Sequence, residues 1–121
     1  MQAMTDLIEG YIASWNESDP ARRRALVART FTEGATYLDP MMQGEGHAGI
    51  EAMIAAVQDR FPGLRFRLAG KVDSHHDRLR FSWELAPPKG AALARGTDFG
   101  VVAADGRLQS VTGFLDMVPG Q

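Results

Sequence analysis

The sequence predicts an α+β fold in which three helices precede an antiparallel sheet that curls over them. In three stretches before residue 62, apolar residues recur every three or four positions, which is typical of amphipathic helices. After residue 63 the spacing changes to two, with short polar turns between the segments, which is typical of consecutive antiparallel strands. We therefore expect two helices, a strand, a third helix and four strands.

The first two helices have clear signals in the sequence. Thr5 can cap a helix that ends near Asn16, and Asp19-Pro20 is an N-cap followed by a first-turn proline that starts a second helix to about Arg29. The arginines at 22–24 point in different directions around this second helix, so a solvated face is expected. The apolar face of the first helix consists of Leu7, Ile8, Tyr11, Ile12 and Trp15.

A short strand is expected from Ala35 to Leu38, and it ends at Asp39-Pro40 because proline cannot donate to a strand ladder. A glycine-rich loop follows, and a third helix runs from about Gly49 to Arg60. The loop spells GxGxxG at 44–49, but a dinucleotide site needs those glycines directly after a strand of a parallel βαβ unit. Tight turning is the simpler interpretation of these glycines.

The second half of the chain consists of four expected strands, at 64–72, 79–85, 92–103 and 107–116. Turn sequences separate them at 76–77, 87–90 and 105–106. The second of these strands has the clearest period of two, because Arg80, Ser82 and Glu84 alternate with apolar residues: Leu79, Phe81, Trp83 and Leu85.

The composition excludes several classes of protein. The 121 residues suffice for one core, so we expect 1–121 to form a single domain. The absence of cysteine excludes disulfide frameworks, thiol nucleophiles and the common structural zinc sites. The net charge of -2 offers no positive field for a nucleic acid. No apolar run approaches the roughly 18 residues of a membrane span, and the first residues lack the basic flank of a secretory signal, so a cytoplasmic protein is expected.

Acid–base chemistry is what the sequence leaves open. The three histidines, His47, His75 and His76, do not have metal-ligand spacing, and no metal is expected. The GxSxG nucleophile elbow and the phosphate-binding P-loop are both absent, which excludes the covalent and phosphoryl-transfer chemistries that use them. Carboxylates, tyrosine and histidine remain as candidate acids and bases.

Three residues are candidates on local grounds. Asp39 closes an apolar run, where desolvation would make it a better base, although capping a turn is the alternative. Asp98 lies inside a long strand and faces either solvent or a polar pocket. Tyr11 lies on the apolar face of the first helix, so its hydroxyl points inward and needs a partner, as a buried structural tyrosine also would.

Three stretches and the order of elements resemble a known superfamily. The stretches are Phe-Thr-Glu-Gly-Ala-Thr-Tyr-Leu-Asp-Pro at 31–40, Asp-Gly-Arg-Leu at 105–108 and Gly-Phe-Leu-Asp at 113–116. Over nearly its whole length the chain resembles the nuclear transport factor 2-like superfamily, specifically its SnoaL-like and ketosteroid isomerase branches. The resemblance implies a cystatin-like, ketosteroid isomerase-like α+β barrel, with a cone-shaped mixed sheet wrapped around three helices and an apolar cavity.

The resemblance also implies roles for the three candidates. Asp39 falls on the general base of ketosteroid isomerases, Tyr11 on the oxyanion-hole tyrosine, and Asp98 on the acid that stays protonated beside it. The implied protein is an isomerase or polyketide cyclase-like enzyme that acts on a small apolar or carbonyl-containing ligand, uses no cofactor, and forms a homodimer through its sheet. The candidate substrate-binding residues are Trp15, His47, Trp83, Phe99, Phe114 and Leu115.

Two other functions remain open at the level of sequence. One is a non-catalytic binding or accessory module that holds a ligand or partner with the same cavity or sheet face. The other, by resemblance to limonene epoxide hydrolases, is an enzyme that activates water with Asp39, Arg80 and Asp98. An arginine inside the cavity, Arg80 or Arg95, would keep Asp98 ionised and remove its role as a hydrogen-bond donor.

Overall fold

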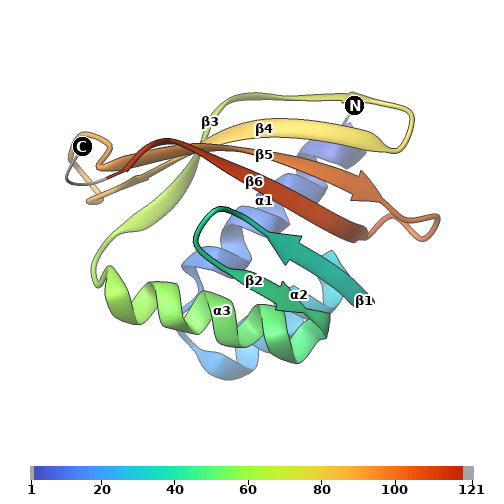
Figure 1. Cartoon of the computed structure of the whole chain (residues 1–121), viewed down its shortest axis with the longest axis horizontal. Coiled ribbons are helices and arrows are strands. Elements are labelled where there is room, and N and C mark those ends of the chain that lie inside the picture. The colour runs from blue at the N-terminus through green and yellow to red at the C-terminus, as the bar shows by residue number, and fades with distance from the viewer. Residues whose placement is uncertain (1, 119–121) are drawn as a thin grey trace.

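The computed structural model describes residues 2–118, and within this range it contains three helices and one six-stranded sheet (Figure 1). All eight predicted elements are present, with ends that differ from the predicted ones by a few residues. The elements in chain order are α1 (Gln2–Asn16), α2 (Pro20–Thr30), β1 (Phe31–Leu38), β2 (Gln43–Glu45), α3 (Gly46–Arg60), β3 (Arg65–His75), β4 (Arg78–Ala86), β5 (Ala94–Val102) and β6 (Leu108–Met117).

The start of the first helix differs from the predicted one, whereas the start of the second does not. Thr5 is not a cap, because α1 already includes Gln2. The second helix starts as predicted, since Asp19 accepts a hydrogen bond from the backbone N–H of Arg22 at 2.9 Å.

A ninth element, β2, lies in the segment predicted to be a loop. Its three residues pair antiparallel with the end of β1, and Tyr37 lies opposite Gly44. The sequence did not predict this strand because three residues are too few to show a period of two. The glycines allow the backbone of β2 to approach the first turn of α3 closely, because a Cβ built on Gly44 would lie 3.0 Å from the carbonyl oxygen of Gly49.

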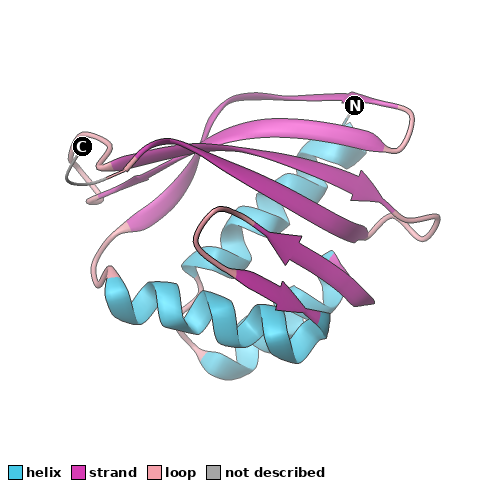
Figure 2. Cartoon of the chain, viewed as in Figure 1, coloured by secondary structure: helices cyan, strands magenta, loops and turns pink. Residues whose placement is uncertain are grey.

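The sheet is mixed and does not close. Its strand order is β2-β1-β6-β5-β4-β3, and β1 runs parallel to β6 while the other neighbours are antiparallel. Strand β3 carries a register irregularity between Ala69 and Asp73, with Gly70 at a φ of 84°, which is the geometry of a β-bulge. The sheet bends so far that the β1–β2 hairpin lies beside α3, while β3–β6 arch over α1 (Figure 2). The α+β class and the curved sheet are therefore confirmed.

The core lies between the concave face of the sheet and the three helices. The face of α1 that the sequence predicted is the buried one: Ile8, Tyr11 and Trp15 are at most 6% exposed. Tyr11 packs against Phe31 of β1 and edge-on against Phe81 of β4, with ring centroids 5.8 and 5.3 Å apart. Helix α1 therefore presents its aromatic residues to both halves of the sheet.

The arginine run in α2 is not simply a solvated face. Arg23 is 7% exposed, and its Nε lies 2.8 Å from Oε1 of Glu51 in α3. Its guanidinium also donates to the side-chain oxygen of Gln58, at 2.7 Å. The prediction was wrong for Arg23 because α3 packs over that side of α2, and the buried pair holds the two helices together.

Candidate functional site

A cavity of about 250 Å³ lies between α1, the C-terminal half of α3 and the concave face of the sheet. Most of its wall is aliphatic, methionine or phenylalanine, and Val118 contributes after the last strand. The lining residues that carry polar atoms are Tyr11, Trp15, Tyr37, Asp39, Arg60 and Trp83. An apolar cavity with a few polar groups on its wall is the usual form of a small-molecule site.

Asp98 is buried behind this wall and holds two of the lining residues. The Tyr11 hydroxyl donates to Asp98 Oδ2 at 2.7 Å, and the Trp83 indole N–H donates to Oδ1 at 3.1 Å. Asp98 is only 2% exposed, so solvent-facing was the wrong alternative for this strand position. Burial raises the pKa of the Asp98 carboxyl to about 6, against the opposing effect of the two hydrogen bonds.

Gly96 makes the contact between Trp83 and Asp98 possible. Gly96 lies opposite Trp83 in the β4–β5 pair, and a Cβ built on it would lie 2.2 Å from Cζ2 of the indole. The Trp83 ring therefore lies against the bare backbone of β5, and its N–H reaches Asp98 two residues further along the same face.

Asp39 lies at the end of β1 on the wall of the cavity. Its Oδ1 accepts hydrogen bonds from the backbone N–H groups of Met41 and Met42, at 2.8 and 2.9 Å. Its Oδ2 accepts from the Tyr37 hydroxyl at 2.7 Å. The aspartate thus caps the turn after β1, as one alternative expected, and it also lines the cavity with Tyr37.

The side chains of Asp98, Asp39 and Tyr37 all lie close to Gly113 of β6. A Cβ built on Gly113 would lie 2.8 Å from Asp98 Oδ1, 3.2 Å from Asp39 Cβ and 3.2 Å from the Tyr37 hydroxyl oxygen. Gly113 is the register partner of Asp98 on the neighbouring strand. A glycine at this point leaves the space in which three polar side chains from β1 and β5 come together.

Both cavity tyrosines remain protonated donors. Burial raises the pKa of Tyr11 well above its usual value, and the negative charge of Asp98 acts in the same direction. Burial likewise raises the pKa of Tyr37, with contributions from Asp98 and Asp39. Each hydroxyl can therefore donate a hydrogen bond at physiological pH without losing its proton.

The structure brings together Tyr11, Asp98 and, above Gly113, Asp39. Of the six residues expected to bind substrate, Trp15 and Trp83 line the cavity. Leu115 packs against the core outside the cavity lining.

The other three lie elsewhere. Phe99 and Phe114 are 40% and 58% exposed, because Asp98 and Gly113 occupy the inward positions next to them in a two-residue period. His47 belongs to the start of α3, where its Nε2 lies 2.7 Å from the carbonyl oxygen of Phe31.

Tyr37 and Arg60 are cavity residues that the sequence analysis did not single out. Tyr37 precedes Asp39 by two residues, so both lie on one face of β1, and this spacing could have identified it. Arg60 ends α3, and no sequence signal distinguishes it from other helix-terminal arginines.

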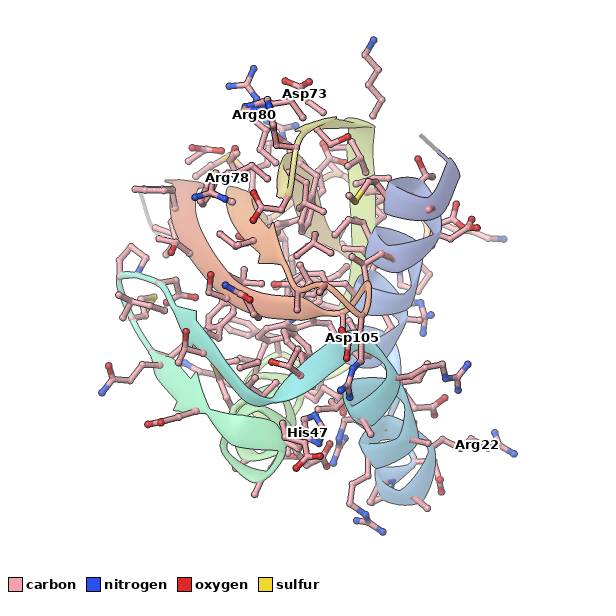
Figure 3. All side chains as sticks on the ribbon, turned by 90° about the vertical axis from the view of Figure 1, so that its right-hand side faces the viewer. Arg22, His47, Asp73, Arg78, Arg80 and Asp105 are labelled. Atoms are coloured by element: carbon pink, nitrogen blue, oxygen red, sulfur yellow. The ribbon has the colours of Figure 1, made fainter. Side chains whose placement is uncertain are left out.

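Neither arginine that could have entered the cavity does so. Arg80 of β4 pairs with Asp73 of the edge strand β3 at 3.0 Å, and both side chains lie exposed on the outer face of the sheet (Figure 3). Arg95 pairs with Glu84 at 3.1 Å, also on the outer face. The arrangement of Asp39, Arg80 and Asp98 that an epoxide hydrolase would need is therefore absent, and no described arginine contacts Asp98.

Residues 2–118 contain neither a metal-binding cluster nor a membrane-spanning helix. No cluster of three or more histidine, aspartate or glutamate side chains in this range could hold a metal ion. None of the described helices is both long enough and apolar enough to cross a bilayer.

Comparisons with known proteins identify the family and agree with the fold. A family model described as a SnoaL-like domain matches residues 8–111. The structure is similar to a putative isomerase of the SnoaL-like family from Agrobacterium tumefaciens str. C58, with 47% identity over 96% of this chain and 99% of that one and a TM-score of 0.91. It also resembles a SnoaL-like polyketide cyclase, likewise named as putative, from Jannaschia sp. CCS1, at 21% identity, 93% and 86% coverage and a TM-score of 0.69. No curated protein matches the chain.

Proposed function

This chain belongs to the SnoaL-like domain family, and on that premise we propose that it is an acid–base enzyme of the isomerase or cyclase type, acting on a carbonyl compound in its apolar cavity. The proposal makes Asp39 the base, and it makes Tyr11 and Asp98 the groups that stabilise an enolate. The isomerase name of the relative from Agrobacterium tumefaciens supports the reaction class.

The observation that carries the proposal is that two aspartate side chains in unlike surroundings lie close to the same residue, Gly113. Asp39 is half-buried and reaches the cavity, whereas Asp98 is 2% exposed and has a pKa raised to about 6. Proton transfer from carbon needs a base at the carbon and hydrogen-bond donors at the oxygen. Carboxyl groups whose surroundings differ in this way can divide those two tasks.

The reaction follows from these positions. Asp39 accepts the proton from the carbon next to the carbonyl, and the C–H electron pair forms the carbon–carbon double bond of an enolate. The carbonyl electron pair moves onto oxygen, where the Tyr11 hydroxyl donates a hydrogen bond. Asp39 then returns the same proton to a different carbon, which regenerates the carboxylate and leaves an isomerised product.

The protonation state of Asp98 decides whether the Tyr11 hydroxyl donates its hydrogen bond to Asp98 or to the ligand. An ionised Asp98 accepts a hydrogen bond from the Tyr11 hydroxyl, which is the direction that this structure has. An apolar ligand that displaces water from the cavity favours the neutral carboxyl, whose pKa of about 6 already lies near neutrality. A neutral Asp98 donates to the Tyr11 oxygen, and Tyr11 can then donate to the ligand.

Deuterium exchange tests the base. The rate at which cyclohex-2-enone exchanges its α-hydrogens in D₂O is measured by NMR with the wild type and with Asp39→Asn. We expect the variant to lose at least about 100-fold of the catalysed rate, because general bases contribute that much or more. Asp73→Asn, a change at an exposed carboxylate outside the cavity, is the control and should keep the full rate. Equal exchange by the wild type and Asp39→Asn would refute the assignment.

One observation favours a second function, a non-catalytic ligand-binding module. Both oxygens of Asp39 accept hydrogen bonds from its own segment, which holds the carboxylate in the turn. In that case the wild type would bind cyclic ketones, detected by quenching of Trp15 and Trp83 fluorescence, yet would exchange their α-hydrogens no faster than buffer.

We also propose that two copies associate through the outer face of the sheet. Phe99 and Phe114 lie on neighbouring strands there and expose 40% and 58% of their surface. Phe114→Arg should convert a dimer into a monomer in sedimentation-velocity experiments, while Leu93→Arg, outside the strands, should leave it unchanged. A wild type that sediments as a monomer at micromolar concentration would contradict this association.

A further inference from the structure

Arg60 is the one positively charged residue on the cavity wall, and within residues 2–118 it has no hydrogen-bond or ion-pair partner. The other charged residue that lines the cavity is Asp39, whose oxygens are occupied by three donors. The cavity wall therefore carries one aspartate whose oxygens are hydrogen-bonded and one arginine without a described protein partner.

The other donors on the wall are already committed or enclosed. Tyr11 and Trp83 donate to Asp98, and Tyr37 donates to Asp39. The indole N–H of Trp15 is buried without a hydrogen-bond partner, and it carries no charge. In the described structure Arg60 is thus the charged donor that is free for a ligand.

Arg60 lies where the cavity opens onto a second hollow. This hollow runs along α3, and it shares part of its lining with the cavity: Met41, Met42, Val57, Arg60 and Phe61. Arg60 is exposed in the last turn of α3, so its guanidinium can reach a group at the mouth while the apolar part of a ligand lies inside. Apolar walls next to a cation weaken solvent screening and strengthen its attraction for an anion.

We propose that the ligand is a carbonyl compound that also carries a carboxylate, and that Arg60 binds this carboxylate at the mouth of the cavity. The planar guanidinium matches a carboxylate in shape, with parallel hydrogen bonds. Asp39 repels an anion, so the carboxylate end lies at Arg60 and the carbonyl end lies towards Asp39. This inference rests on the proposed function, because that function supplies the carbonyl end.

Matched ligands test the inference through binding alone. Isothermal titration calorimetry compares 2-acetylnaphthalene with 6-acetyl-2-naphthoate, which adds only the carboxylate. The wild type should bind the carboxylate three- to tenfold more tightly at low ionic strength, and 0.5 M salt should reduce this advantage because the pair lies near solvent. Arg60→Gln should remove the advantage, so that it binds the two ligands with equal affinity.

Two controls make the result specific. Arg29→Gln changes the net charge equally at an exposed position in α2 outside the cavity lining, and it should keep the advantage. Arg60→Lys should keep part of it, because a point charge remains without the planar pair of donors. Thermal unfolding of each variant confirms that the fold is intact.

Three results would overturn the inference: equal binding of the two ligands by the wild type, an advantage that persists in Arg60→Gln, or an equal loss in Arg29→Gln. Tighter binding of 6-acetyl-2-naphthyl phosphate than of the carboxylate would overturn the choice of carboxylate. Failure of the proposed function is a separate result, since Asp39→Asn could leave exchange unchanged while the Arg60-dependent advantage remains.

Discussion

Replacing Asp98 with asparagine should change the pH dependence of stability in a defined direction. Asparagine has nearly the same shape but does not titrate. Burial raises the pKa of the Asp98 carboxyl from 3.8 to about 6 in the folded chain. At about 1.4 kcal/mol per pH unit, this difference corresponds to about 3 kcal/mol.

The sign follows from which form the folded protein prefers. The folded state holds the proton more tightly than the unfolded state, so between about pH 4 and 6 it binds more protons, and stability falls as pH rises. The contribution of Asp98 is therefore fully present below pH 4 and is lost above pH 6. Asp98→Asn lacks this loss, although it disturbs the hydrogen bonds from Tyr11 and Trp83 by an amount that does not depend on pH.

Urea denaturation of both proteins at pH 4, 5, 6 and 7 measures the effect. The free energy of unfolding of the wild type minus that of Asp98→Asn should fall by about 3 kcal/mol between pH 4 and 7, because the other titrating groups are common to both proteins. A difference that is constant across this range, or that rises with pH, would refute the claim that burial dominates the electrostatics of Asp98.

Two further variants test other parts of the structure. Gly113→Ala should lower the free energy of unfolding by about 1–3 kcal/mol and displace Asp98 from Trp83. Gly34→Ala, with no atom within 4 Å of its new Cβ, is the control and should change that free energy by less than about 0.5 kcal/mol. Equal urea midpoints for the two variants would contradict the packing above Gly113. Arg23→Met should lower the free energy of unfolding by about 3 kcal/mol, because it leaves Glu51 buried without its partner. Adding Glu51→Met should recover part of this loss in the same assay. No loss in Arg23→Met would contradict the buried ion pair.

The helices, and the order in which the longer strands follow one another along the chain, could be predicted from the sequence because their signals are local. The apolar face of α1 requires only a period near 3.6, and the strand turns are marked by glycine, proline and aspartate. β2 could not be predicted in this way, since a three-residue strand is defined by its partner β1 and has no period of its own.

The face that each strand buries was harder to predict. A period of two tells which residues share a face, but not which face is inward. In β5 the inward residues around Asp98 are small, Gly96 and Gly100, because Trp83 and Leu79 lie against them. Hydrophobicity alone therefore favours the wrong side of β5 and places Phe99 among the cavity residues.

The candidate site was identified mainly by the resemblance to known proteins. Local patterns made Tyr11, Asp39 and Asp98 candidates but could not show that they meet, since they come from α1, the end of β1 and β5. Arg60 could not be identified from the sequence, because its proposed role in binding follows from the cavity that it borders and from its lack of a described partner.

The crystal structure of a complex with 2-acetylnaphthalene would test most directly whether Asp39 and Tyr11 face the reacting atoms. We predict that the ketone oxygen lies about 3 Å from the Tyr11 hydroxyl and that the α-carbon lies within about 3.5 Å of an Asp39 carboxylate oxygen. A ketone bound in the cavity with its α-carbon remote from Asp39, or bound only on the outer face of the sheet, would contradict the proposed function.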